Sequence, residues 1–196
     1  SKHTRRTLDV DGRHYDYFSL AAAAAMGLSG IARLPYTLKI VLENLMRQQV
    51  QGTASGEDVE ALVDWLQNRG SEREIGFRPA RVLMPESSGI PLLGDMAAMR
   101  DAMVKLGADP NRINPLIPVD FIVDHSVMVD QSGCVDAVVH NMDREADQNK
   151  ERYEFLRWGS SVFENLRVIP PGTGISHQIN LEYLAKVAWT AKDPLG

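Results

Sequence analysis

Apolar residues follow two different spacings along this 196-residue chain. After Pro35 they recur three and four positions apart, as on the buried face of an amphipathic helix. The residues on this face are Leu38, Val41, Leu42, Leu45 and Met46. Elsewhere, short apolar runs lie between segments rich in glycine and proline, which is typical of buried strands.

These patterns predict short strands that alternate with helices. Strands are expected at residues 80–84, 121–129 and 166–169, with a small hairpin at residues 7–15 around Asp11-Gly12. Helices are expected through the alanine run 21–25 behind Ser19, and at residues 35–50, 56–68, 96–106 behind Asp95, 152–163 and 181–189. The alternation favours an α/β fold with a mainly parallel sheet covered by helices.

Three segments rich in polar residues or glycine follow or end the expected strands. They are Pro85–Gly89, the segment that carries Asp124, and Gly172–His177. Sites in parallel sheets collect at the carboxyl ends of the strands. We therefore expect these three segments to meet at one edge of the sheet.

Asp124, His125 and Ser126 interrupt the apolar run Phe121–Val129. Burying a carboxylate and an imidazole costs free energy unless each satisfies the other. An aspartate beside a histidine favours the charged imidazolium, which is a competent general acid. The pattern therefore fits a proton-transfer site, and it equally fits a hydrogen-bonded polar pair with a structural role.

The composition narrows the class of protein. The net charge of −5 and pI of about 5.5 give no support to a dedicated nucleic-acid surface. The single cysteine, Cys134, excludes an internal disulfide and a multi-cysteine metal site within this chain. No signal peptide or membrane-length apolar run is present, so we expect a cytoplasmic protein and no membrane partner. Because the chain starts at Ser1 and stops at Gly196, we expect both ends to be cuts in a longer polypeptide.

Several motifs, in order along the chain, resemble the amino-terminal domain of the aconitase family, in the branch of bacterial aconitase A and the iron regulatory protein. These motifs are Arg33–Thr37, Val41–Leu45, Pro79–Val82, Ala97–Ala102, Asn114-Pro115, Val123–Ser126, Arg152–Gly159, Pro170–Ile175 and His177–Leu184. The resemblance implies a three-layer α/β/α domain over residues 18–196, preceded by an arm of residues 1–17.

The resemblance also implies hydro-lyase chemistry, in which citrate and isocitrate interconvert through cis-aconitate. It gives Asp124, His125 and His177 catalytic roles in proton transfer, and it places Ser126 among the substrate-binding residues. Pro85 stands where the family has a glutamine that contacts substrate, so this contact is lost or replaced here.

The family's [4Fe-4S] cluster belongs to the full-length enzyme, because its cysteines lie outside this chain. The fragment alone is therefore expected to bind no cofactor and to be inactive. Its expected partners are the remainder of the aconitase chain, or a second subunit, and a tricarboxylate substrate.

Two other functions stay open at this stage. Because of Pro85, a related hydro-lyase acting on methylcitrate or another tricarboxylate is one alternative. The other is an RNA-binding regulatory apo-aconitase module, which the acidic balance of the chain disfavours.

Overall fold

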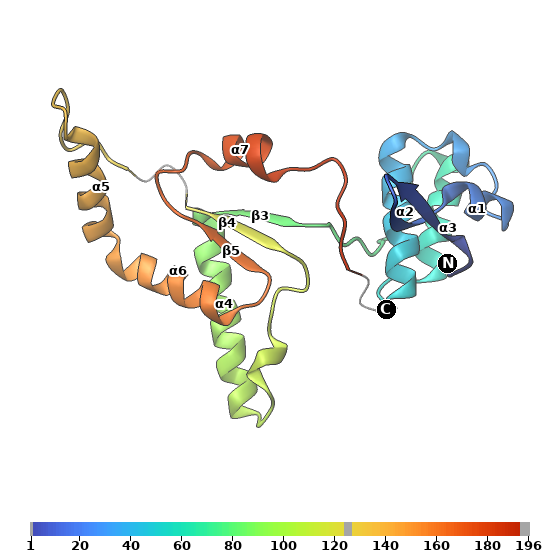
Figure 1. Ribbon diagram of the computed structural model, residues 1–196. Helices are drawn as coiled ribbons and strands as arrows, with labels where there is room; N and C mark the ends of the chain where they lie inside the picture. The colour runs from blue at the N-terminus through green and yellow to red at the C-terminus, as the bar shows by residue number, and fades with distance from the viewer. Residues whose placement is uncertain (1, 124–126, 193–196) are drawn as a thin grey trace. The chain divides into compact units, whose positions relative to one another are not determined.

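The computed structural model describes residues 2–123 and 127–192. The chain forms two compact units, one made of Ser1–Pro79 with Thr190–Gly196 and the other of Ala80–Trp189 (Figure 1). The expected division into an arm of residues 1–17 and a domain of residues 18–196 stays a prediction.

The first unit begins with the predicted hairpin. Its strands are antiparallel and pair Val10 with Arg13 next to the turn. Asp11 and Gly12 form the turn with φ of 51° and 77°, and positive φ at both central residues matches the twist of the strands. The elements are η1 (Lys2–Thr4), β1 (Arg5–Val10) and β2 (Arg13–Phe18).

Helices supply the core of the first unit, and the structure confirms three predicted from the sequence. They are α1 (Leu20–Ala25), α2 (Tyr36–Val50) and α3 (Gly56–Asn68), with a short η2 (Ile31–Arg33). Ser19 caps α1 by accepting a hydrogen bond from the Ala22 amide at 3.2 Å. Ser55 and Asp58 cap α3 reciprocally. The predicted stripe of α2 is buried at Leu42, Leu45 and Met46, which pack with Val59, Leu62 and Leu66 of α3.

The second unit contains a three-stranded parallel sheet in the order β3-β4-β5. Its strands are β3 (Val82–Pro85), β4 (Val119–Ile122) and β5 (Leu166–Ile169). All four residues of the central strand β4 are buried, which is the pattern of a parallel strand covered on both faces.

Helices lie on both sides of this sheet (Figure 1). On one face, Phe121 packs with Leu93 and Leu156, and on the other Ile122 packs with Ile179 and Leu184. The elements of this unit outside the sheet are α4 (Glu86–Lys105), η3 (Pro110–Arg112), α5 (Ala137–Gln148), α6 (Lys150–Val162), α7 (Ser176–Ile179) and the π-helical η4 (Asn180–Leu184). The predicted α/β fold with a parallel sheet between helical layers is confirmed.

One strand is shorter than predicted. The run Phe121–Val129 does not form one buried strand, because β4 ends at Ile122 and Val127–Val129 are exposed. The neighbouring strands explain the difference, since β3 and β5 end in register with Ile122. The Val123 amide still donates to the Ile169 carbonyl, at 3.0 Å.

Two helices also differ from the prediction. α4 begins directly at Glu86, so Pro85–Gly89 is not a free loop and Asp95 is not an N-cap. Gly89 allows the early turns of α4 to approach Phe121 closely, and Pro91 inside the helix removes one backbone hydrogen bond. The helix expected at residues 181–189 instead spans 176–184 as α7 and η4, where Ala185 donates to the Asn180 carbonyl at 2.7 Å and closes the last turn.

Gly89 gives a test of the packing between α4 and the sheet. A Cβ at this position would lie 2.3 Å from Cε2 of Phe121. We expect Gly89→Ala to lower the free energy of unfolding by about 1–3 kcal/mol, because the buried ring must move. Urea denaturation measures this change. The control is Gly94→Ala in the same helix, where a Cβ meets nothing within 4 Å and helix propensity should add about 0.5–1 kcal/mol. Equal effects of the two substitutions would contradict the packing.

Candidate functional site

The carboxyl ends of the three parallel strands form one edge. The register places Pro85, Ile122 and Ile169 side by side, so the chain leaves all three strands at the same level. The three strands therefore end at one level, and the expected meeting of the segments that follow them stays a prediction for the segment that carries Asp124. Open parallel sheets bind their ligands outside this edge.

The Asp124-His125-Ser126 segment follows Val123 directly in the sequence. These three residues lie outside the described residues, so their roles stay predictions. Val123 itself is 1% exposed, and its amide is bonded to the Ile169 carbonyl. The chain therefore leaves the central strand at a residue that is buried and hydrogen-bonded to β5.

Pro85 and Glu86 stand at the end of β3. Pro85 is the last residue of β3 and the N-cap of α4, and its side chain has no hydrogen-bond donor or acceptor. Glu86 forms an ion pair with Arg152 of α6, in which the carboxylate side chain is 14% exposed. Asn149 also accepts a hydrogen bond from Arg152. The Glu86 carboxylate is thus engaged by a neighbouring helix.

A buried carboxylate continues this polar network. Glu145 of α5 is 5% exposed, and it accepts hydrogen bonds from Tyr153 Oη at 2.6 Å and Asn149 Nδ2 at 2.7 Å. Burial, together with the hydrogen bond to Glu145, raises the pKa of the Tyr153 hydroxyl well above its usual value. The highly charged stretch 143–152 is therefore not solvated throughout, because Glu145 is buried. The four-residue spacing of Glu145, Asn149 and Tyr153 is a sequence pattern that could have indicated their contact.

His177 lies on α7, beyond the turn that follows β5. Gly172 and Gly174 make this turn with φ of 77° and 138°, a region that favours glycine. The His177 side chain is exposed and forms no hydrogen bond or ion pair within residues 2–123 and 127–192. Its predicted catalytic role is untested by this geometry.

The buried side chain of Asp120 links the sheet to the segment that carries His177. Its carboxylate binds Arg81 Nη1 at 2.9 Å and Arg167 Nε at 2.7 Å. The hydrogen bond to Asp120 raises the pKa of the Arg167 guanidinium, so this arginine stays charged. Arg81 also donates to the Asn180 side chain at the start of η4. Sequence reasoning missed this network, because its members lie far apart along the chain.

A [4Fe-4S] cluster does not fit the side chains that the structure describes. Such clusters are held mainly by cysteine thiolates, and Cys134 is a single exposed cysteine. Within the described ranges, no three His, Cys, Asp or Glu side chains are grouped so that they could hold a metal ion. In the same ranges, no helix has the length and apolar character to cross a membrane.

Comparison with known proteins agrees with the resemblance drawn from the motifs. The model of the aconitase family (aconitate hydratase) matches residues 57–192. Aconitate hydratase A of Legionella pneumophila is 51% identical over 190 residues, which are 97% of this chain and 21% of the relative. The same enzyme of Pseudomonas aeruginosa is 52% identical over 95% of this chain and 20% of its own, and that of Escherichia coli K12 is 48% identical over 95% and 21%.

This chain belongs to the aconitase family. It spans about a fifth of the length of the curated relatives that it matches. The prediction that it corresponds to one part of an aconitate hydratase is confirmed.

The link through Arg81 can be tested by mutation. We expect Arg81→Ala to lower the free energy of unfolding by about 2–3 kcal/mol, because it removes one partner of the buried Asp120 and the bond to Asn180. Urea denaturation measures the loss. Arg157→Ala, an exposed arginine on α6, is the control and should change stability by less than about 0.5 kcal/mol. A loss no greater than that of the control would show that the network does not stabilise this unit.

Proposed function

We propose that this chain is the amino-terminal part of an aconitate hydratase, an enzyme that interconverts citrate and isocitrate through cis-aconitate. The family match supports the reaction class. We assign the site to the edge of the sheet where Pro85, Ile122 and Ile169 end their strands. Asp124 and His125 follow the central strand almost directly in the sequence. The chain provides one wall of the active site and is inactive alone.

In this proposal, His125 donates the proton that the leaving hydroxyl needs. During dehydration the C–O bond breaks, the hydroxyl takes the imidazolium proton, and water leaves. Asp124 holds the imidazole in its charged form, because a neighbouring carboxylate favours the cation. His177 supplies a second imidazole from the turn after β5, and Ser126 contacts the substrate. The base that removes the carbon-bound proton comes from outside this chain.

The [4Fe-4S] cluster of the whole enzyme has its cysteine ligands in the rest of the polypeptide. The poor fit of Cys134 and the described side chains to such a cluster supports this division. The remainder of the aconitase chain, or a second subunit, is therefore the main partner. A tricarboxylate is the substrate, and the bacterial relatives are consistent with a cytoplasmic enzyme.

The residues at the end of β3 support a different substrate as the main alternative. Pro85 offers no side-chain hydrogen bond, and Glu86 is held by Arg152. A site that has lost a substrate contact in this way suits an altered tricarboxylate such as methylcitrate. Comparing kcat/KM for citrate and methylcitrate in the complete enzyme separates the two, and a preference for methylcitrate would replace the first proposal.

A regulatory RNA-binding module is the alternative from another class. The net charge of −5 opposes it, because binding to phosphates depends on lysine and arginine. A salt-dependent gel shift with the complete apo-protein would favour that function.

The role of His125 is testable in a complete hydratase. We expect His125→Ala to lower kcat about 100-fold or more, because the leaving hydroxyl loses its proton donor. The cluster absorbance should stay unchanged, and the measurement is the rate of cis-aconitate formation from isocitrate. His14→Ala, in the exposed hairpin, serves as the control for loss of a histidine. An unchanged kcat in His125→Ala would remove His125 from the mechanism.

A further inference from the structure

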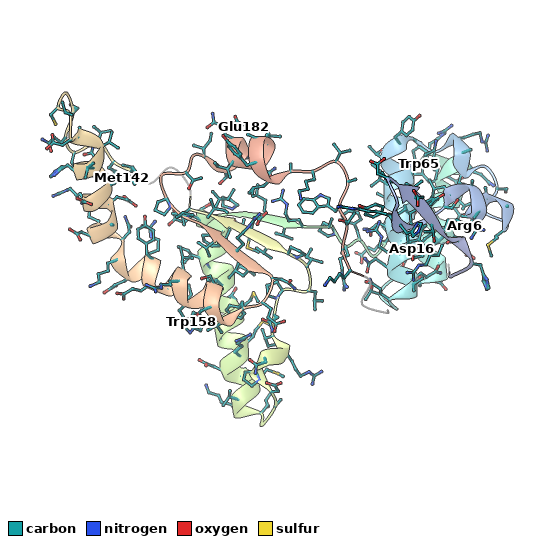
Figure 2. All side chains as sticks on the ribbon, in the orientation of Figure 1. Arg6, Asp16, Trp65, Met142, Trp158 and Glu182 are labelled. Carbon is teal, nitrogen blue, oxygen red and sulfur yellow. The ribbon has the colours of Figure 1, made fainter. Side chains whose placement is uncertain are left out.

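Helix α5 exposes its apolar residues and buries polar ones. Its buried residues are Asn141 and Glu145. Val138, Val139 and Met142 are 69%, 62% and 46% exposed and lie on one side of the helix, which we call the α5 apolar face (Figure 2 labels Met142). An amphipathic helix normally turns such a stripe toward a core.

The chain before α5 extends this exposed apolar surface. Val135, in the turn before the helix, is fully exposed, and Met128 and Val129 are 68% and 74% exposed. Asn141 holds the chain after Val129 against α5, because its side-chain oxygen accepts hydrogen bonds from the amides of residues 130 and 131 at 3.0 and 2.9 Å. Several exposed apolar side chains therefore lie on α5 and on the chain held beside it.

This surface borders the edge where the three strands end. Met142 Cε lies 3.4 Å from the position that a Cβ on Gly172 would take, so α5 touches the turn after β5. Residues 127–129 follow Asp124–Ser126 directly in the chain. A protein segment that completes a site at this edge would therefore lie against the α5 apolar face.

We propose that the α5 apolar face, together with Met128 and Val129, is the surface on which the rest of the aconitase polypeptide packs. The proposal rests on the function proposed above. Two observations select this occupant over a second copy of the chain. The chain spans about a fifth of its relatives, so most of the family's polypeptide lies outside it. The described residues do not fit the cluster, so in the proposed function its ligands come from the polypeptide outside this chain, and a site completed at the carboxyl edge would bring that polypeptide toward this face.

Methionine oxidation by hydrogen peroxide tests the proposal, because the rate follows exposure. Two proteins are compared: this chain, and a chimera in which it replaces the matching fifth of the Legionella pneumophila enzyme. We expect Met128 and Met142 to be oxidised about fivefold or more slowly in the chimera. Met99 on α4, 51% exposed, is the control and should react at the same rate in both. Unchanged rates at Met142, or equal protection of all three, would overturn the proposal.

A substitution gives a second measurement on the same two proteins. Val139→Asp should leave the melting temperature of this chain unchanged and lower that of the chimera, because it buries a carboxylate at the contact. Val104→Asp, at a valine of α4 that is 61% exposed, is matched to Val139 at 62% and should lower neither. Equal effects of the two substitutions in the chimera would contradict the proposed contact.

The oligomeric state of this chain and the activity of the chimera distinguish the proposed surface from a dimer contact and from a failure of the proposed function. A dimer of this chain by light scattering, abolished by Val139→Asp, would assign the face to a second copy and overturn the proposal. A chimera that turns over citrate with Met142 still reactive would overturn the surface and leave the function standing. Protection of Met142 without turnover would support the surface and contradict the function.

Discussion

The second unit depends on a charge placed inside its sheet. Asp120 lies in the central strand β4 and is almost fully buried, so its carboxylate must be neutralised by partners that reach it. Arg81, just before β3, and Arg167, in β5, form ion pairs with this carboxylate. Arg81 also donates a hydrogen bond to the Asn180 side chain in η4. A single buried carboxylate thereby fixes all three strands and the helical segment that follows His177. The apolar packing of Phe121 and Ile122 on opposite faces completes the unit.

This arrangement has a chemical consequence at the carboxyl edge. Because the strands are parallel and end in register, three chain segments leave the sheet at one level. The segment after β3 begins with the ion-paired carboxylate of Glu86, and the segment after β5 contains the glycine turn before His177. In the sequence, Asp124 and His125 follow the central strand.

Much of the fold could be predicted from local pattern. Helices α2 and α3 follow from apolar spacing and the Ser55 cap, and the hairpin follows from Asp11-Gly12. The predictions are wrong where tertiary contacts determine where an element begins or ends. The length of β4 depends on where its neighbours stop, and the early start of α4 depends on Gly89 fitting against Phe121. The common level of the strand ends was predictable from the sequence. The Asp120 and Glu145 networks were not, because the partners of Asp120 are distant in sequence and those of Glu145 lie in a highly charged stretch.

If these residues form one wall of an aconitate hydratase active site, they should support turnover when joined to the rest of such an enzyme. This can be measured as the turnover of citrate by a full-length Legionella pneumophila enzyme whose matching fifth is replaced by this chain. We expect kcat/KM within about tenfold of the parent enzyme, a difference of about 1.4 kcal/mol in activation free energy. A chimera that folds and carries its cluster but does not convert citrate would show that this chain does not form that wall.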